Sequence, residues 1–389
     1  MKFYLRKTLL TAGAVVLGTF GLNANTPDKT VSAATPAETL KNELRNNVVH
    51  HRTMFGHHDD TVYGHEWTAT RGESKNEGRS DIQEVTGYYP AVMSWDLGGM
   101  ELESPDNLDG VPFDMIRRQA QAQHARGGVN VFSWHPRNPV NGADSWNVER
   151  KDIVNKIRTD AEVNKKYQAN VRRLAQYLKS MTDENGKPFG VVFRPWHEMT
   201  GGWFWWGLPN CNPEDYKYLW TEMRRIFDEE KVDNVVWSYS PDRVNSEEQY
   251  LAAYPGDDYV DVLGCDVYEF DAEGGDKTYR EAANTSLFVM TNLARKHDKI
   301  PAFTETGLEG VTNPKWYTSQ LLPLLKKYRV AYVVVWRNAE DNKKHYYTPY
   351  KGHPATEDFK AFVNDNTIIM AGKPAVCGNE AGCGRCAGE

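Results

Sequence analysis

Short apolar runs alternate with longer amphipathic stretches along most of this chain. From residue 50 onward, eight runs rich in apolar residues are separated by polar segments with helical spacing. The runs are residues 53–58, 90–96, 128–135, 189–198, 234–240, 260–268, 300–305 and 330–336. This alternation is typical of parallel strands joined by crossover helices, because a parallel strand needs a long return connection.

The segments between the runs favour helices. Ala, Leu, Arg, Lys and Glu recur at helical spacing in residues 113–126, 164–181, 213–229, 278–297 and 356–362. Eight strands with such connections predict a closed (β/α)8 barrel, a TIM barrel, formed by residues 34–370 as one catalytic domain. The chain of 389 residues is long enough for this fold, since α/β barrels typically take about 250 residues or more.

Every predicted strand ends in polar or aromatic side chains. Strands often end in something polar, so chance grouping is the competing explanation for any single ending. The endings are His57 and His58, Trp95 and Asp96, Trp134 and His135, His197 and Glu198, Ser240 and Asp242, Asp266 and Tyr268, Glu305, and Trp336 and Arg337. Because the strand ends of a barrel meet at one face, the set indicates an active site there.

Two glutamates stand out among these endings. Glu198 ends the fourth run and Glu305 ends the seventh, and both follow runs too apolar for exposed strands. Surface glutamates are common and solvated, so a pair alone is weak evidence. Cleavage of a glycosidic bond with retention needs one carboxylic acid to protonate the leaving oxygen and one carboxylate to attack the anomeric carbon. The pair therefore predicts a retaining glycoside hydrolase.

An aromatic loop follows Glu198. Residues 199–207 read MTGGWFWWG, with three Trp and one Phe in four consecutive positions. Sugar rings stack on indole, so such a loop beside an acid suits a polysaccharide cleft. Packing against the barrel accounts for Phe204 and one Trp, and we expect the other two Trp to face the substrate.

At this point the chain resembles glycoside hydrolase family 26, whose best-known members are β-mannanases. The resemblance covers roughly residues 40–365 and rests on RPWHE at 194–198, its aromatic continuation, TETG at 304–307 and WRNA at 336–339. It implies that Glu198 is the acid/base and Glu305 the nucleophile. It also implies a substrate-binding lining of His135, His197, Trp203, Asp266, Tyr268 and Trp336. Trp196 stands where the family commonly has Phe, a mild departure.

The resemblance implies a retaining endo-β-1,4-mannanase that acts on mannan, galactomannan or glucomannan by double displacement. The same scaffold admits mixed-linkage β-1,3-1,4-glucan or β-1,3-xylan, and a non-catalytic glycan-binding protein is the alternative from another class. Nothing in the sequence reports the configuration of the sugar at C2.

Each implied role has a physical counterpart. Burial beside Trp203 is expected to raise the pKa of Glu198 and keep it protonated. Glu305 has to stay ionised, so we expect hydrogen-bond donors around it, with Tyr268 and Arg194 as candidates. Asp266 and His135 either hold sugar hydroxyls or are satisfied structural groups. Arg337 reaches a neighbouring sugar or a carboxylate on the barrel rim.

Composition and charge give no sign of a nucleic-acid partner or a cofactor. The formal net charge is −7 and no Lys/Arg stripe is present, so a neutral substrate is expected. The string from His57 to Asp60 contains residue types that bind zinc. Adjacent residues on a strand point to opposite faces, so we expect no metal there. The mixed-charge segment 64–80 is expected to be a solvated loop.

The two ends of the chain carry further signals. Basic residues at Lys2, Arg6 and Lys7 precede an apolar run from 9 to 20 that is too short to span a bilayer, which predicts a signal peptide over residues 1–33. The cut site is ambiguous between Ala24 and residues 31–33. We expect an exported protein with no membrane span in its mature form, either periplasmic or secreted. Its oligomeric state is not encoded in any pattern we recognise.

Five cysteines leave at least one thiol without a partner in the chain. The pairing cannot be read from their spacing. Residues 371–389 form a Cys/Gly-rich tail in which a local disulfide is favoured over a metal site, because too few ligands lie nearby. The cysteines are Cys211, Cys265, Cys377, Cys383 and Cys386.

Overall fold

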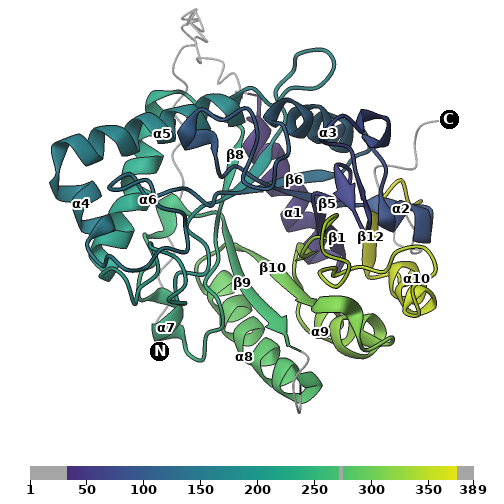
Figure 1. Cartoon of the computed structure of the whole chain (residues 1–389). Coiled ribbons are helices and arrows are strands. Elements are labelled where there is room, and N and C mark those ends of the chain that lie inside the picture. Colours follow the sequence, from purple (N-terminus) through teal and green to yellow (C-terminus); the bar gives the residue numbers. More distant parts are fainter. Residues whose placement is uncertain (1–32, 271–274, 375–389) are drawn as a thin grey trace, which may run out of the picture. The chain divides into compact units, whose positions relative to one another are not determined.

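The computed structural model describes residues 33–270 and 275–374, and its centre is a closed barrel of parallel strands (Figure 1). Eight strands follow each other around the barrel in chain order, and pairing of the last with the first closes it. They are β1 (Thr53–His58), β5 (Val92–Asp96), β6 (Val129–Ser133), β7 (Val191–Arg194), β8 (Val235–Tyr239), β9 (Val262–Glu269), β10 (Ile300–Leu308) and β11 (Tyr332–Val335). The predicted (β/α)8 barrel is confirmed.

The predicted helices are present with small shifts at their ends. They are α3 (Phe113–Ala125), α5 (Ala161–Lys179), α6 (Pro213–Glu229), α8 (Gly275–Lys296) and α10 (Thr356–Asn364). The sequence pattern missed several others: α1 (Pro36–Val49), α2 (Asp81–Thr86), α4 (Ile153–Thr159), α7 (Glu247–Leu251) and α9 (Leu322–Lys327). Two short strands, β4 (Tyr89–Pro90) and β12 (Ile368–Ala371), extend the sheet beside β1. None of the described helices combines the length and apolarity needed to cross a bilayer.

Alternation along each strand separates two cores. In β7, Val192 belongs to the core inside the barrel, whereas Val191 and Phe193 belong to the core between the strands and the outer helices. Successive side chains of a strand point to opposite faces, so Arg194 continues the inward row of Val192. Strand alternation thus carries this arginine to the inside of the barrel.

Helix α1 closes the amino-terminal end of the barrel and lies behind the strands in Figure 1. It begins at a capping box, in which the Glu38 amide donates to Thr35 Oγ1 at 3.1 Å and the Thr35 amide donates to Glu38 Oε2 at 2.7 Å. Leu40 and Leu44 pack with the inward-facing residues of the strands. Gly190 lies against this helix, where a Cβ would meet the Pro36 carbonyl oxygen at 2.5 Å.

The segment after β1 is only partly the solvated loop that the charges suggested. Most of its charged side chains are exposed, including Glu66 and Arg71. A two-stranded ribbon, β2 (Tyr63–Gly64) with β3 (Trp67–Thr68), buries Trp67, whose indole N–H donates to Asp81 Oδ1 at 2.7 Å. The apolar ring anchors this segment to α2 because its one polar atom finds a buried acceptor.

Several predictions concern residues outside the described ranges. The signal peptide falls on residues 1–33, and Cys377, Cys383 and Cys386 fall in the tail. Cys211 and Cys265, which the structure does describe, are free thiols.

Truncation of Leu44 tests the role of α1. Leu44 is fully buried inside the barrel, so Leu44→Ala should lower the free energy of unfolding by about 2–5 kcal/mol. Val49→Ala is the matched control on the same helix, because Val49 is exposed, and it should change stability by less than about 0.5 kcal/mol. Urea denaturation followed by circular dichroism measures both. Equal losses of stability in the two variants would contradict the packing of α1 against the amino-terminal end of the barrel.

Candidate active site

Glu305 lies inside the barrel because β10 is irregular. Phe303 pairs with Cys265, and Glu305 pairs with the next residue of β9, Asp266. β10 therefore contains one extra residue between these two pairs. Without that extra residue, Glu305 would follow Phe303 and Thr304 in strict alternation and point to the outer helices. A bulge of this kind re-aims the side chains that follow it. Gly264 makes room for the bulge, since a Cβ there would meet Thr304 Oγ1 at 2.5 Å.

Two donors hold the carboxylate of Glu305. The Arg194 guanidinium forms an ion pair with Oε1, and the Tyr268 hydroxyl donates to Oε2 at 2.7 Å. The sequence suggested both donors. β10 continues past Glu305 to Leu308, so this residue does not end the strand as the apolar run suggested. Each oxygen of the Glu305 carboxyl group therefore meets one donor of the protein.

Arg194 connects three of the inward-facing strands. Its Nη1 donates to Ser240 Oγ and to Asp266 Oδ2, each at 2.9 Å, while Nη2 contacts Glu305. Burial by itself would lower the pKa of Arg194, but the charges of Asp266 and Glu305 raise it above the ordinary value. The guanidinium therefore stays charged.

Asp266 lies beneath the pocket. It has no exposed surface, and Thr304 Oγ1 donates to its Oδ1 at 2.6 Å while Arg194 occupies Oδ2. With both oxygens engaged, this carboxylate fits the structural alternative that the sequence left open. It orients Arg194, and through it Glu305, without offering an oxygen to a sugar.

Glu198 lies in the loop after β7, because that strand ends at Arg194 and does not extend to residue 198 as the apolar run suggested. Its Oε2 accepts a hydrogen bond of 2.7 Å from the Trp203 indole N–H. Burial, and then the negative charges of Glu305 and Asp266, raise the pKa of Glu198 well above its ordinary value, while the Trp203 hydrogen bond opposes this. The two glutamates thus have different surroundings: one indole N–H donates to Glu198, whereas a guanidinium and a hydroxyl contact Glu305.

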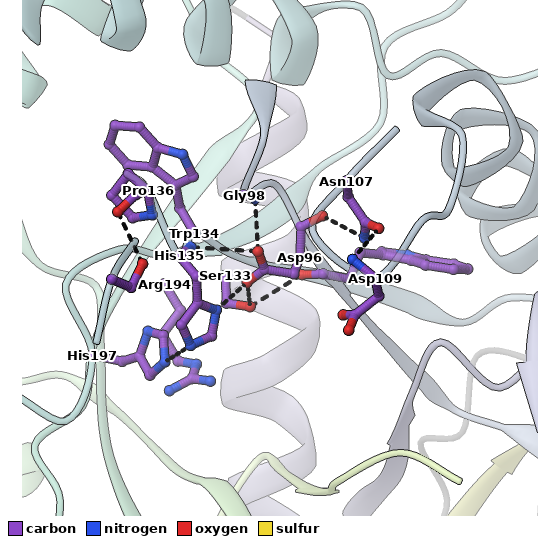
Figure 2. Close-up of polar contacts among 12 residues, drawn as sticks. Asp96, Gly98, Asn107, Asp109, Ser133, Trp134, His135, Pro136, Arg194 and His197 are labelled. Atoms are coloured by element: carbon purple, nitrogen blue, oxygen red, sulfur yellow. Dashed lines mark hydrogen bonds and ion pairs between the residues drawn. The ribbon is translucent and has the colours of Figure 1, made fainter. Parts of the chain in front are cut away.

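A chain of polar contacts links Asp96, His135 and His197 (Figure 2). Asp96 Oδ2 lies 2.6 Å from His135 Nδ1, and His135 Nε2 lies 3.1 Å from His197 Nε2. Burial alone would raise the pKa of Asp96, but His135, Ser133 and the Gly98 amide lower it, so this carboxylate is ionised. Both ring nitrogens of His135 are engaged, which makes it a support for His197 and not a free ligand for a sugar hydroxyl.

His197 remains neutral in this chain. Burial first, and then the charge of Arg194, lower its pKa well below the ordinary value. The ionised Asp96 can only accept a hydrogen bond, so His135 Nδ1 is the donor in that contact. The buried Nδ1 of His197 has no hydrogen-bond partner in the described structure.

The aromatic loop is more buried than the sequence suggested. Phe204, Trp205 and Trp206 all pack in the core, whereas Trp203 is 40% exposed. The expectation that only Phe204 and one Trp would be buried was therefore wrong. Trp205 and Trp206 find acceptors for their N–H groups inside the fold, at the carbonyls of Pro136 and His197. Internal acceptors remove the cost of burying those donors.

Trp336 and Arg337 lie at another side of the barrel mouth. The Trp336 ring stacks on His58 with centroids 4.3 Å apart, and Arg337 forms an ion pair with Asp109. Arg337 also borders a cavity of about 340 Å³ lined by Tyr63, Arg71, Leu108, Asp109, Gly110, Ala339, Glu340 and Asp341. The carboxylate alternative for Arg337 is thus observed, and the cavity leaves room for a ligand beside it.

The string from His57 to Asp60 does not converge on one point. His57 Nδ1 lies 3.0 Å from Asp60, whereas His58 Nδ1 lies 3.1 Å from Ser94 Oγ. His58, Asp59 and Asp109 do have ligand atoms within 4.8 Å of one another. Tyr63 donates to Asp59 and Arg337 pairs with Asp109, so groups of the protein already occupy these carboxylates.

The sequence missed two contributors to this region. Asp96 was noted as a strand ending but received no role, because its partner His135 lies on the next strand. Trp146 lies in the loop after β6, is 50% exposed, and stacks on His135 at 5.4 Å between centroids with an interplanar angle of 11°. No periodic pattern surrounds Trp146, so its position beside the site was visible only in the structure.

Comparison with known proteins agrees with this geometry. A mannan endo-1,4-beta-mannosidase of Bifidobacterium adolescentis is 28% identical over 339 residues, which are 82% of this chain and 34% of that protein. One from Bacillus subtilis is 28% identical over 268 residues, 66% of this chain and 68% of that protein. The chain thus spans about a third of the first relative and about two thirds of the second.

Solved structures and a family model extend the comparison. The structure of a GH26 beta-mannanase from Bacteroides ovatus superimposes with a TM-score of 0.82 at 42% identity, covering 87% of this chain and 95% of that one. The catalytic domain of a Bacillus sp. JAMB-750 GH26 endo-beta-1,4-mannanase gives 0.76 at 27% identity, covering 87% and 93%. The family model of glycosyl hydrolase family 26 matches residues 30–318. The chain therefore belongs to glycosyl hydrolase family 26, as its motifs indicated.

Proposed function

We propose that this protein is a retaining endo-β-1,4-mannanase that hydrolyses mannan, galactomannan or glucomannan. The observation that carries the proposal is the contrast between Glu198, whose surroundings raise its pKa, and Glu305, whose two oxygens face Arg194 and Tyr268. An acid and a nucleophile in one site need different surroundings, because the acid has to carry a proton and the nucleophile a charge. The names of the relatives from Bifidobacterium adolescentis and Bacillus subtilis support mannan as the substrate.

The proposed reaction uses the carboxyl groups of Glu305 and Glu198. Glu305 attacks the anomeric carbon and forms a glycosyl ester, while the bond from that carbon to the glycosidic oxygen breaks and Glu198 gives its proton to the leaving oxygen. Glu198 is then a carboxylate and removes a proton from water, which attacks the same carbon and releases Glu305. Two inversions leave the sugar configuration unchanged. The raised pKa of Glu198 keeps the acid protonated to higher pH than an ordinary glutamate.

The surrounding side chains supply binding and orientation. Trp203, which is half-exposed and bonded to Glu198, offers an aromatic face next to the leaving group. Tyr268 contacts Glu305 and Trp336 stacks on His58, and Arg337 borders the cavity in which we place a neighbouring sugar. His197, with His135 behind it, completes the lining, and Asp266 acts through Arg194.

We further propose that residues 1–33 are a signal peptide and that the catalytic domain covers 34–370, followed by a Cys/Gly-rich tail. Basic residues before a short apolar run support export. The polymeric substrate also supports a periplasmic or secreted location, because a polysaccharide is too large to enter the cell intact.

A panel of polymers tests the proposed substrate. Galactomannan and glucomannan should release reducing sugar, whereas barley β-glucan and β-1,3-xylan should release little. Measurement of reducing ends on all four separates the mannanase from the glucanase and xylanase alternatives. No release from any polymer would favour a non-catalytic glycan-binding protein and overturn the proposal.

Substitution of the nucleophile tests the covalent step. Glu305→Ala should lower turnover by roughly 10⁴-fold or more, the scale seen when a nucleophile is removed. Added azide should restore turnover of an activated aryl mannoside and give a mannosyl azide of inverted configuration, because azide enters on the face that Glu305 attacks. Glu357→Ala, at an exposed position on α10, is the control that keeps full activity. Wild-type turnover in Glu305→Ala would refute the assignment.

Substitution of the acid tests the proton transfer. Glu198→Ala should slow substrates with poor leaving groups by about 10²–10⁴-fold. Formation of the glycosyl-enzyme from 2,4-dinitrophenyl β-mannobioside should lose far less, because that leaving group departs without a proton. Pre-steady-state release of dinitrophenolate measures this step. Equal losses on both kinds of substrate would count against an acid role.

A further inference from the structure

The backbone that presents Glu198 is held in an uncommon conformation. Trp196 and Glu198 both have a φ of 54°, in the left-handed region that side chains other than glycine rarely adopt. Each such residue costs of order 1–3 kcal/mol and persists only where the surroundings enforce it. Something in the fold must therefore hold residues 196–198 in place.

Four hydrogen bonds involve the backbone of this segment, and the local one runs from the Gly201 amide to the Glu198 carbonyl at 2.9 Å. The Tyr216 hydroxyl donates to the Trp196 carbonyl at 2.7 Å, and the Trp206 indole N–H donates to the His197 carbonyl at 2.8 Å. The Glu198 amide donates to the Ser240 carbonyl at 2.8 Å. Two of the four donors are side chains, so substitution can remove them without changing residues 196–198 themselves.

Both side-chain donors are fully buried in the core. Tyr216 and Trp206 have no exposed surface. The Trp220 indole N–H donates to the Tyr216 hydroxyl at 3.1 Å, and the Trp206 ring stacks on Phe204 with centroids 4.4 Å apart. Neither side chain can reach a substrate, so an effect of either on catalysis has to pass through the backbone it holds.

We propose that Tyr216 and Trp206 are positioning residues that clamp the strained 196–198 backbone and so fix the carboxyl group of Glu198 against the leaving oxygen. The inference rests on the proposed role of Glu198 as the acid. A carboxyl group displaced by about 1 Å loses much of its efficiency in proton transfer, because the reacting atoms must be aligned at contact distance. Glu305 is held by Arg194 and Tyr268, and neither of these side chains is hydrogen-bonded to Tyr216 or Trp206, so attack by Glu305 should be much less affected by loss of the clamp.

The test compares two leaving groups in conservative variants. Tyr216→Phe and Trp206→Phe each remove one donor and keep a ring. Each should lower kcat on galactomannan by about 5- to 10-fold, the equivalent of one lost hydrogen bond. Release of dinitrophenolate from 2,4-dinitrophenyl β-mannobioside should change by less than about twofold, and KM should stay near the wild-type value.

Tyr177→Phe is the matched control. Tyr177 is also buried, and its hydroxyl donates to the Phe113 carbonyl at 2.8 Å, between α5 and α3 and away from Glu198. Tyr177→Phe should lose a comparable amount of stability, but it should not slow galactomannan turnover more than dinitrophenolate release. Thermal unfolding of all the variants shows whether a change in activity merely follows a change in stability.

The outcomes separate the clamp from the function on which it rests. Suppose that Glu198→Ala slows galactomannan turnover far more than dinitrophenolate release. If Tyr216→Phe and Trp206→Phe then slow the two reactions equally, or slow neither, the clamp is refuted while the acid role stands. If Glu198→Ala itself slows the two reactions equally, the proposed acid role of Glu198 is refuted, and the clamp with it. Should Tyr216→Phe not fold, Trp206→Phe alone decides. The inference is also refuted if Tyr177→Phe shows as large a difference between galactomannan turnover and dinitrophenolate release as Tyr216→Phe and Trp206→Phe do.

Discussion

The buried guanidinium of Arg194 is the contact on which the pocket depends. It joins Ser240, Asp266 and Glu305, which come from three successive segments of the barrel, at a place with almost no solvent. A buried charge is costly unless partners surround it, and removal of one partner from a buried pair typically costs about 3–5 kcal/mol. Two carboxylates around one guanidinium leave an excess negative charge. Burial first, and then the negative charges of Glu305 and Asp266, raise the pKa of nearby Glu198, so the carboxylates that bind Arg194 also influence this carboxyl group.

The two glutamates reach this centre by different departures from regular structure. A bulge in β10 turns Glu305 inward against the strict alternation of the strand. Glu198 instead leaves the sheet, in a loop whose backbone adopts left-handed φ values at two residues. Irregular backbone carries a cost in stability, and here the surrounding hydrogen bonds and packing offset it. The irregularities occur where side chains have to be aimed at one point.

Aromatic residues connect the stability of the fold to the geometry of the pocket. Trp206 and Tyr216 are core residues by their burial, yet each uses its polar atom on the segment that carries Glu198. His135 is similar, since its ring lies between Asp96 and His197 and stacks against Trp146. The residues behind the pocket are therefore aromatic side chains that bury a ring and use a polar ring atom or hydroxyl for a hydrogen bond of defined direction.

The sequence by itself determined the barrel, singled out Glu198 and Glu305 as candidates and suggested the two donors that hold Glu305. These follow from local information: the alternation of apolar and amphipathic segments, and the polar residues at the ends of strands. Only the tertiary structure decided that α1 plugs the barrel, although its capping box lies openly in the sequence at Thr35 and Glu38. The inward turn of Glu305, the loop position of Glu198 and the burial of Trp205 and Trp206 were likewise decided by contacts between distant segments. Periodicity reports which face of an element is apolar, but a bulge, a strained loop or a buried indole is stabilised by partners far away in the chain, such as Gly264, Ser240 and Pro136, and these partners meet only when the barrel closes.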